Sequence, residues 1–114
     1  MRVGRAEALD LFRKWASEGA LLRCDFGFAE FAASFRGRIR EVAEESLKLS
    51  ANDTVSELVL LLPDGLDFWY ADPRGFTEEA EIFECGLTVS FPARIGATVD
   101  TLSFNELKEL PHSS

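Results

Sequence analysis

The sequence predicts a mainly β protein with one N-terminal helix, folded as a bent antiparallel sheet or small barrel and α+β overall. Three observations support this prediction. Apolar residues recur with a period near 3.6 up to residue 18 and with a period of 2 from about residue 20 to residue 104. Turn-forming residues separate the alternating segments at short intervals. No second amphipathic helical segment lies between them, which argues against parallel βαβ units.

Residues 5–18 are predicted to form the helix. Their apolar residues lie three, four and seven positions apart, whereas most charged residues occupy other positions. Gly19 follows directly, where a glycine in the left-handed conformation commonly ends a helix. The predicted apolar stripe consists of Ala8, Leu9, Leu11, Phe12, Trp15 and Ala16.

Two strands are predicted next. Leu22 to Phe28 alternates apolar and polar residues, as a half-buried strand does. Glu30 to Val42 reads as a long strand with Gly37 in its middle, which marks a sharp bend or a close approach of another backbone. The parity of apolar residues shifts near Glu41 and Val42, which suits a bulge or the end of the strand.

The remaining predicted strands are short. Their ranges are 46–50, 55–62, 66–71, 82–91 and 98–104. The turn sequence Pro63-Asp64-Gly65 lies between two apolar runs and predicts that they pair as a hairpin. Residues 105–110 are compatible with a last helical turn, and the tail 111–114 is expected to fray.

Composition limits the classes of protein and of partner. A chain of 114 residues is expected to form a single domain, residues 1–114, with a core of its own. No run approaches the roughly 18 apolar residues needed to cross a membrane, and no secretory signal pattern follows the start, so we expect a soluble cytoplasmic protein. The net charge of −8 argues against general nucleic-acid binding, because such a chain repels phosphates unless its positive charge is concentrated.

Three of the twelve lysines and arginines are concentrated in one short stretch. Arg36, Arg38 and Arg40 alternate with apolar residues, so an extended backbone would place all three guanidinium groups on one face. Three interpretations remain open for this arginine stripe. The side chains pair with carboxylates of a neighbouring strand, bind an acidic partner or phosphate group, or line a contact between subunits.

Trp69 is the other candidate binding residue. Phe68 and Tyr70 share one face of the predicted strand and are expected in the core, so Trp69 points outward to the surface or to an interface. An aromatic ligand wall next to Asp67 is the alternative interpretation.

No catalytic, metal or cofactor motif is present in the sequence. The only histidine, His112, lies in the tail, so neither a Ser-His-Asp arrangement nor a histidine-based metal site is expected. Cys24 and Cys85 lack the paired spacing of a zinc site and are expected to be buried thiols. Glycine-rich phosphate loops are missing as well.

Residues 5–50 resemble the first part of the Sm-like proteins. These have an N-terminal helix followed by alternating apolar positions, a glycine, an apolar residue two positions on, an acidic turn and a further apolar pair. The matching residues are Phe31, Ala33, Phe35, Gly37, Ile39, Glu44, Glu45, Leu47 and Leu49. The resemblance implies a strongly bent small barrel, RNA binding and ring assembly. The second Sm motif has no clear counterpart, so no uridine-contacting residue is assigned.

Two hypotheses on function follow. The first is a non-enzymatic binding or interaction module that forms a homo-oligomer or binds a protein partner, through an exposed sheet edge or its aromatic surface. It rests on the many predicted strands, whose edges must be protected or paired. The second is RNA or nucleotide binding through the arginine stripe.

Overall fold

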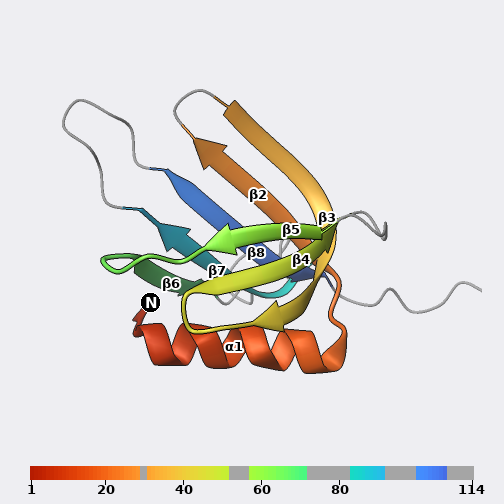
Figure 1. The fold of residues 1–114 in the computed structure, drawn as a ribbon, viewed down its shortest axis with the longest axis horizontal. Coiled ribbons are helices and arrows are strands. Elements are labelled where there is room, and N and C mark those ends of the chain that lie inside the picture. Colours follow the sequence, from red (N-terminus) through yellow and green to blue (C-terminus); the bar gives the residue numbers. More distant parts are fainter. Residues whose placement is uncertain (29–30, 52–56, 72–82, 92–99, 108–114) are drawn as a thin grey trace, which may run out of the picture.

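The predicted N-terminal helix and antiparallel sheet are both present in the computed structural model (Figure 1). The structure describes residues 1–28, 31–51, 57–71, 83–91 and 100–107. The elements are β1 (Arg2–Val3), α1 (Arg5–Glu18), β2 (Leu22–Phe28), β3 (Phe31–Val42), β4 (Ser46–Ala51), β5 (Glu57–Leu61), β6 (Asp67–Ala71), β7 (Phe83–Ser90) and β8 (Thr101–Leu107). The described strands form a single sheet in the order β1-β6-β7-β8-β2-β3-β4-β5, with antiparallel neighbours throughout.

The helix α1 has the bounds that its periodicity predicts. Gly19 has a φ of 63°, and its N–H donates to the carbonyl oxygen of Ala16, which confirms the expected left-handed helix end. The apolar stripe faces the sheet, with Phe12 and Trp15 fully buried. The helix therefore forms one wall of the core.

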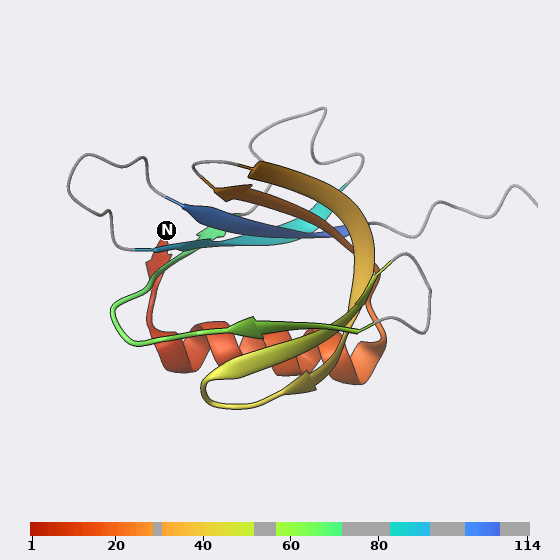
Figure 2. The same cartoon turned by 45° about the horizontal axis from the view of Figure 1, so that its top comes forward.

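The long strand β3 bends the sheet. In Figure 2 it curves from the layer that contains β2 and β8 to the layer that contains β4 and β5, beside α1. A Cβ atom at Gly37 would lie 2.8 Å from the carbonyl oxygen of Ser50, so the two backbones approach too closely for a side chain. The pairing with β4 shifts register between Ile39 and Glu41, and β3 ends at Val42, so both features predicted as alternatives near Glu41 and Val42 are present.

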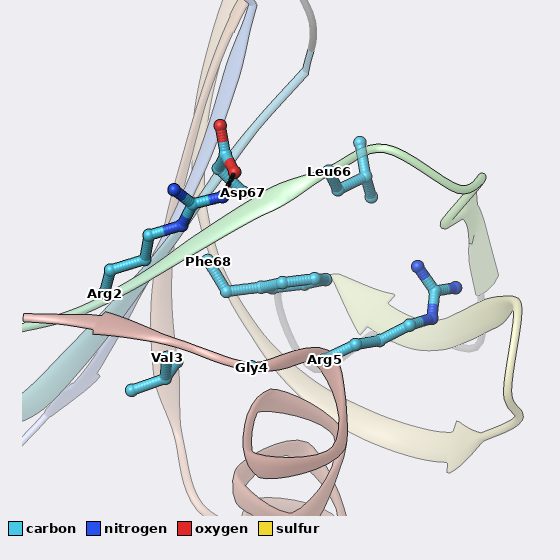
Figure 3. A pocket seen from close by; sticks show the side chains of 7 residues that line it. All are labelled: Arg2, Val3, Gly4, Arg5, Leu66, Asp67 and Phe68. Atoms are coloured by element: carbon cyan, nitrogen blue, oxygen red, sulfur yellow. Dashed lines mark hydrogen bonds and ion pairs between the residues drawn. The ribbon is translucent and has the colours of Figure 1, made fainter.

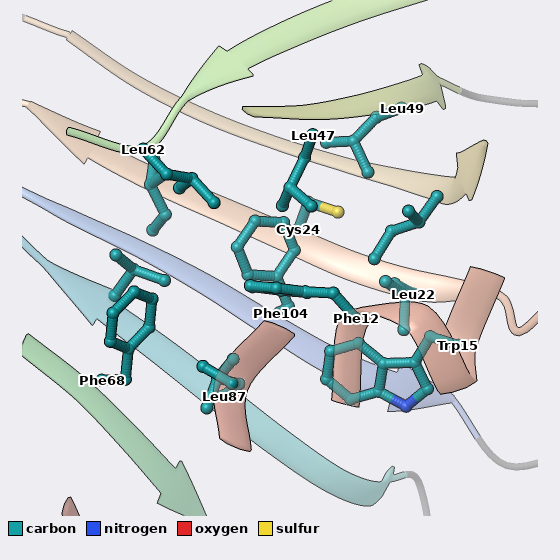
Figure 4. Close-up of a cluster of buried hydrophobic side chains, with 14 of the residues drawn as sticks. Phe12, Trp15, Leu22, Cys24, Leu47, Leu49, Leu62, Phe68, Leu87 and Phe104 are labelled. Atoms are coloured by element: carbon teal, nitrogen blue, oxygen red, sulfur yellow. The ribbon is translucent and has the colours of Figure 1, made fainter. Parts of the chain in front are cut away.

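The core lies between the bent sheet and α1 (Figure 4). Edge-to-face ring contacts link the two: Phe12 on the helix contacts Phe104 on β8 at 5.3 Å between ring centroids. Phe104 contacts Phe26 on β2 at 5.6 Å, and Phe26 contacts Phe35 on β3 at 5.2 Å. Such pairs add to the free energy gained from burying their apolar area.

The structure corrects two predictions on pairing and local form. The predicted hairpin around Pro63-Asp64-Gly65 is wrong, since β5 pairs with β4 and β6 pairs with β1 and β7. A helical turn at residues 105–110 is contradicted as far as Leu107, because β8 extends to that residue; residues 108–110 and the tail lie outside the described part of the chain. The short strand β1 was not predicted at all.

Candidate functional site

The arginine stripe follows β3 through its bend. Arg38 Nε donates to the carbonyl oxygen of Gly19 at 3.2 Å, at the end of α1. Arg40 Nε donates to Ser50 Oγ on β4 at 3.0 Å. Arg40 also lies at the bulge, so its position departs from a regular alternation. The stripe is thus partly engaged in hydrogen bonds that hold the bend, and its role in binding stays a prediction.

A further arginine joins the stripe from the neighbouring strand. Arg23 on β2 lies directly opposite Arg36 on β3, and both residues are exposed. Like charges in directly opposite positions are unfavourable. The Asp25 carboxylate offsets part of this repulsion, because it lies 3.3 Å from Arg23 Nε and accepts a hydrogen bond from Ser34 Oγ. The alternation of the β2 segment could have identified Arg23, but only the strand register places it beside Arg36.

Trp69 projects outward from β6, as its parity predicts. Its side chain is 45% exposed, whereas Phe68 beside it is buried. Trp69 lies opposite Arg2 on β1 and Thr88 on β7. Among the side chains whose burial the structure describes, it is the only aromatic residue that is exposed.

A shallow groove of about 420 Å³ lies where β1 and the start of α1 meet β6 (Figure 3). Arg2 forms an ion pair with Asp67 on its rim. Arg5 donates to the carbonyl oxygens of Glu44, Leu62 and Pro63, so its guanidinium joins the first residue of α1 to two loops of the sheet. Both arginines thus have partners within the chain, and their contacts join β1 and the start of α1 to the sheet.

The edge strand β5 carries three of the five exposed large apolar side chains of the described chain. Leu61 is 71% exposed, Val59 is 51% exposed and Leu58 is 37% exposed. β5 pairs with β4 on one side, and no other described strand pairs with it on the opposite side. The exposure of these residues was not foreseen, because the predicted hairpin would have covered this edge with residues 66–71.

A small polar network joins α1, β7 and β8. The Trp15 indole N–H donates to Glu106 Oε1 at 2.8 Å, and the Cys85 thiol lies 3.7 Å from the same oxygen. Burial, and next the nearby Glu106 carboxylate, raise the pKa of Cys85 to about 11. Burial also raises the pKa of Cys24 to about 12. Both cysteines are buried free thiols, as predicted, and at neutral pH they are protonated and poorly nucleophilic.

The described residues offer neither a metal site nor a membrane-spanning helix. They contain no group of three or more histidine, cysteine, aspartate or glutamate residues that could hold a metal ion. Among them there is also no helix whose length and apolar character would allow it to span a membrane. His112 lies outside this part of the chain.

Comparisons with known proteins add no family. No protein-family model, no curated protein and no solved structure matches this chain. Among the candidate surfaces of the described residues, β5 combines exposed apolar side chains with an open sheet edge.

Proposed function

We propose that this protein is a non-enzymatic interaction module that associates with further copies of itself through the edge strand β5. The observation that carries the proposal is the exposure of Val59 and Leu61 on a strand whose second side pairs with no described strand. Edge strands of this kind offer unpaired backbone groups to another chain, and soluble proteins usually protect them.

Three of the usual protective features are missing from β5. The strand Glu57–Leu61 contains no lysine, no proline and no register shift against β4, and its only charged residue is Glu57 at one end. By contrast, the opposite edge of the sheet is the two-residue strand β1, which begins with Arg2. The two edges therefore differ, and β5 is the one suited to pair with a partner.

The charge of the chain sets how association depends on salt. Each copy carries a net charge of −8, so two copies repel each other at long range. Salt screens this repulsion but leaves the apolar contact in place. Association through β5 should therefore become stronger as the ionic strength rises.

Sedimentation velocity over a concentration series tests the proposal. We expect the wild-type chain to shift towards a dimer at high concentration and Leu61→Lys to remain a monomer, because a lysine on the edge opposes pairing. Trp69→Lys is the matched control, since it removes an exposed apolar residue from another strand, and it should sediment like the wild type. A wild-type chain that stays monomeric at every concentration and salt level would reject self-association.

The second candidate is RNA or nucleotide binding through Arg36, Arg38 and Arg40. The observation that favours it is Arg23, which lies opposite Arg36 and enlarges the stripe. Proteins that bind phosphates in this way lose affinity as salt increases, the reverse of the dependence expected for self-association. The resemblance to Sm-like proteins belongs to this candidate and stays a prediction.

Titration with a labelled oligouridine at low salt tests this candidate. Binding that weakens with salt and is lost in the double variant Arg23→Ala/Arg36→Ala would support it, and Arg13→Ala on the exposed face of α1 is the control. The absence of binding at low salt would reject it.

A further inference from the structure

The alternation of hydrogen bonds identifies which backbone groups of β5 face its open edge. The Leu62 N–H donates to the carbonyl oxygen of Glu45 at 2.7 Å, within the register that pairs Leu60 with Leu47. In an antiparallel pair, every second residue directs its N–H and C=O towards the neighbouring strand. Leu58 and Leu60 therefore bond towards β4, like Leu62. The backbone groups directed to the open edge belong to Glu57, Val59 and Leu61.

The same three residues direct their side chains outward. Val59 and Leu61 are the more exposed apolar residues of β5, at 51% and 71%, and Leu62 on the other parity is fully buried. Leu58 on the inward parity is 37% exposed, so solvent reaches the open edge from that side as well. Backbone groups and apolar side chains are thus presented together, which is the combination that binds an added strand.

We infer that the partner is a second copy of this chain, and that its β5 pairs antiparallel with the first about a two-fold axis at Val59. This inference rests on the proposed self-association. In this register Val59 lies opposite the partner's Val59, and Glu57 lies opposite the partner's Leu61. It is the register that pairs all of Glu57–Leu61 in both copies. The sheet then continues from one copy into the other, in an isologous contact that closes after two copies.

The charge distribution along β5 favours this arrangement over a parallel one. The only charged residue of the strand is Glu57 at its beginning. Antiparallel pairing separates the two Glu57 carboxylates to opposite ends of the contact, whereas parallel pairing in register would place them side by side at an energetic cost. On the outward face of each copy, Val59 lies beside Lys48 on β4, and this row of side chains continues across the two-fold axis into the partner. Lys48 keeps its ion pair with Glu41.

The size of the contact predicts its strength. One strand from each copy buries less than the roughly 1,200–2,000 Å² that stable specific interfaces bury in total. We therefore expect a weak, reversible dimer whose population depends on concentration.

Disulfide trapping tests the register. Directly opposite residues whose backbones are bonded to each other lie about 5.5 Å apart between Cα atoms, within the range that a disulfide spans. Val59→Cys is therefore expected to form a covalent dimer under mild oxidation. Leu61→Cys is the matched control: its counterpart lies about four residues further along the partner strand, beyond the roughly 7 Å limit, and it should link at least about tenfold more slowly. The wild-type chain, with only buried thiols, should not link.

The double variant Glu57→Cys/Leu61→Cys gives a second reading of the same register, since these two positions are expected to face each other across the axis. Efficient trapping of Val59→Cys and of this double variant supports the inference. If sedimentation shows a dimer but Leu61→Cys links as fast as Val59→Cys, or neither links, the two-fold register is overturned while self-association stands. A chain that stays monomeric at all concentrations overturns both.

Discussion

The bend of β3 depends on the absence of a side chain at Gly37. The carbonyl oxygen of Ser50 on β4 lies 2.8 Å from where a Cβ atom would be, so even the smallest side chain forces one of the two strands to move. A glycine in the middle of a strand predicts a sharp bend or a close approach of another backbone, but only the pairing of β3 with β4 shows that the approaching atom is the carbonyl oxygen of Ser50.

Gly37→Ala should therefore destabilise the fold, by about 1–3 kcal/mol, the usual cost of forcing extra volume into a packed region. Urea denaturation measures the change in the free energy of unfolding. Gly27→Ala on β2 is the control, because a Cβ there would meet Thr101 Oγ1 at an ordinary 3.6 Å. Equal losses in both variants would show that close approach is not the cause.

The buried thiols make stability depend on alkaline pH. Burial raises the pKa of Cys24 to about 12 and that of Cys85 to about 11, above the ordinary value of 9.0. Above pH 9 the unfolded chain releases these protons while the folded chain retains them, so the unfolded state binds fewer protons and stability falls as pH rises. The contribution is fully present below pH 9 and is lost as pH rises through the folded pKa values.

Urea denaturation from pH 7 to 11 measures this dependence, and Cys24→Ala should reduce the loss of stability above pH 9. In the native protein neither thiol should react readily with a thiol reagent at pH 8, whereas both should react in denaturant. A Cys24→Ala variant with the same alkaline slope as the wild type would contradict the assignment.

At the scale of single residues, parity predicted most of what is buried and exposed. Phe68 lies in the core and Trp69 outside, as the alternation requires. The role of Arg5 could not be predicted, because its hydrogen bonds reach carbonyl oxygens 39 to 58 residues away along the chain. The opposition of Arg23 and Arg36 depends likewise on strand register, which composition does not reveal.

At the scale of elements, α1 is joined to the sheet at its first residue. A positive side chain at a helix N-terminus is unfavourable with the helix dipole. At Arg5 the hydrogen bonds to Glu44, Leu62 and Pro63 offset this cost. The hydrogen bonds to Leu62 and Pro63 also hold the loop between β5 and β6. This loop connects the edge strand β5 to β6, the strand next to the opposite edge.

Arg5→Ala should lower the free energy of unfolding by about 1.5–3 kcal/mol, the range for hydrogen bonds that involve a charged group. Arg5→Lys should recover only part of this loss, since an ammonium group cannot reproduce the fork of a guanidinium. Thermal and urea denaturation measure both. The control is Arg13→Ala, whose exposed ion pair with Asp10 should contribute less than about 1 kcal/mol. A loss no larger in Arg5→Ala than in this control would contradict the role of Arg5.

The failed hairpin prediction shows what turn chemistry reveals and what it does not. Gly65 has a φ of 87°, so Pro63-Asp64-Gly65 does form a turn. The turn does not bring β5 and β6 together, however, because β6 pairs with β1 on one side and with β7 on the other. Local sequence specifies that the chain changes direction, while long-range pairing decides which strands become neighbours.

At the scale of the whole molecule, the sheet bends around its core without closing into a barrel. Its two edge strands, β1 and β5, do not pair with each other. The fold class, the helix and the approximate positions of seven strands could be predicted because each has a clear hydrophobic period. The identity of the open edge could not, since it follows from the strand order.

Amide hydrogen exchange, resolved by residue and measured at several protein concentrations, is the most direct test of association through β5. The Leu60 amide bonds towards β4 and should be protected at every concentration. The Val59 and Leu61 amides face the open edge, so they should exchange rapidly in dilute solution and become protected as the concentration rises. Exchange at Val59 and Leu61 that stays the same over the whole concentration range would contradict the account.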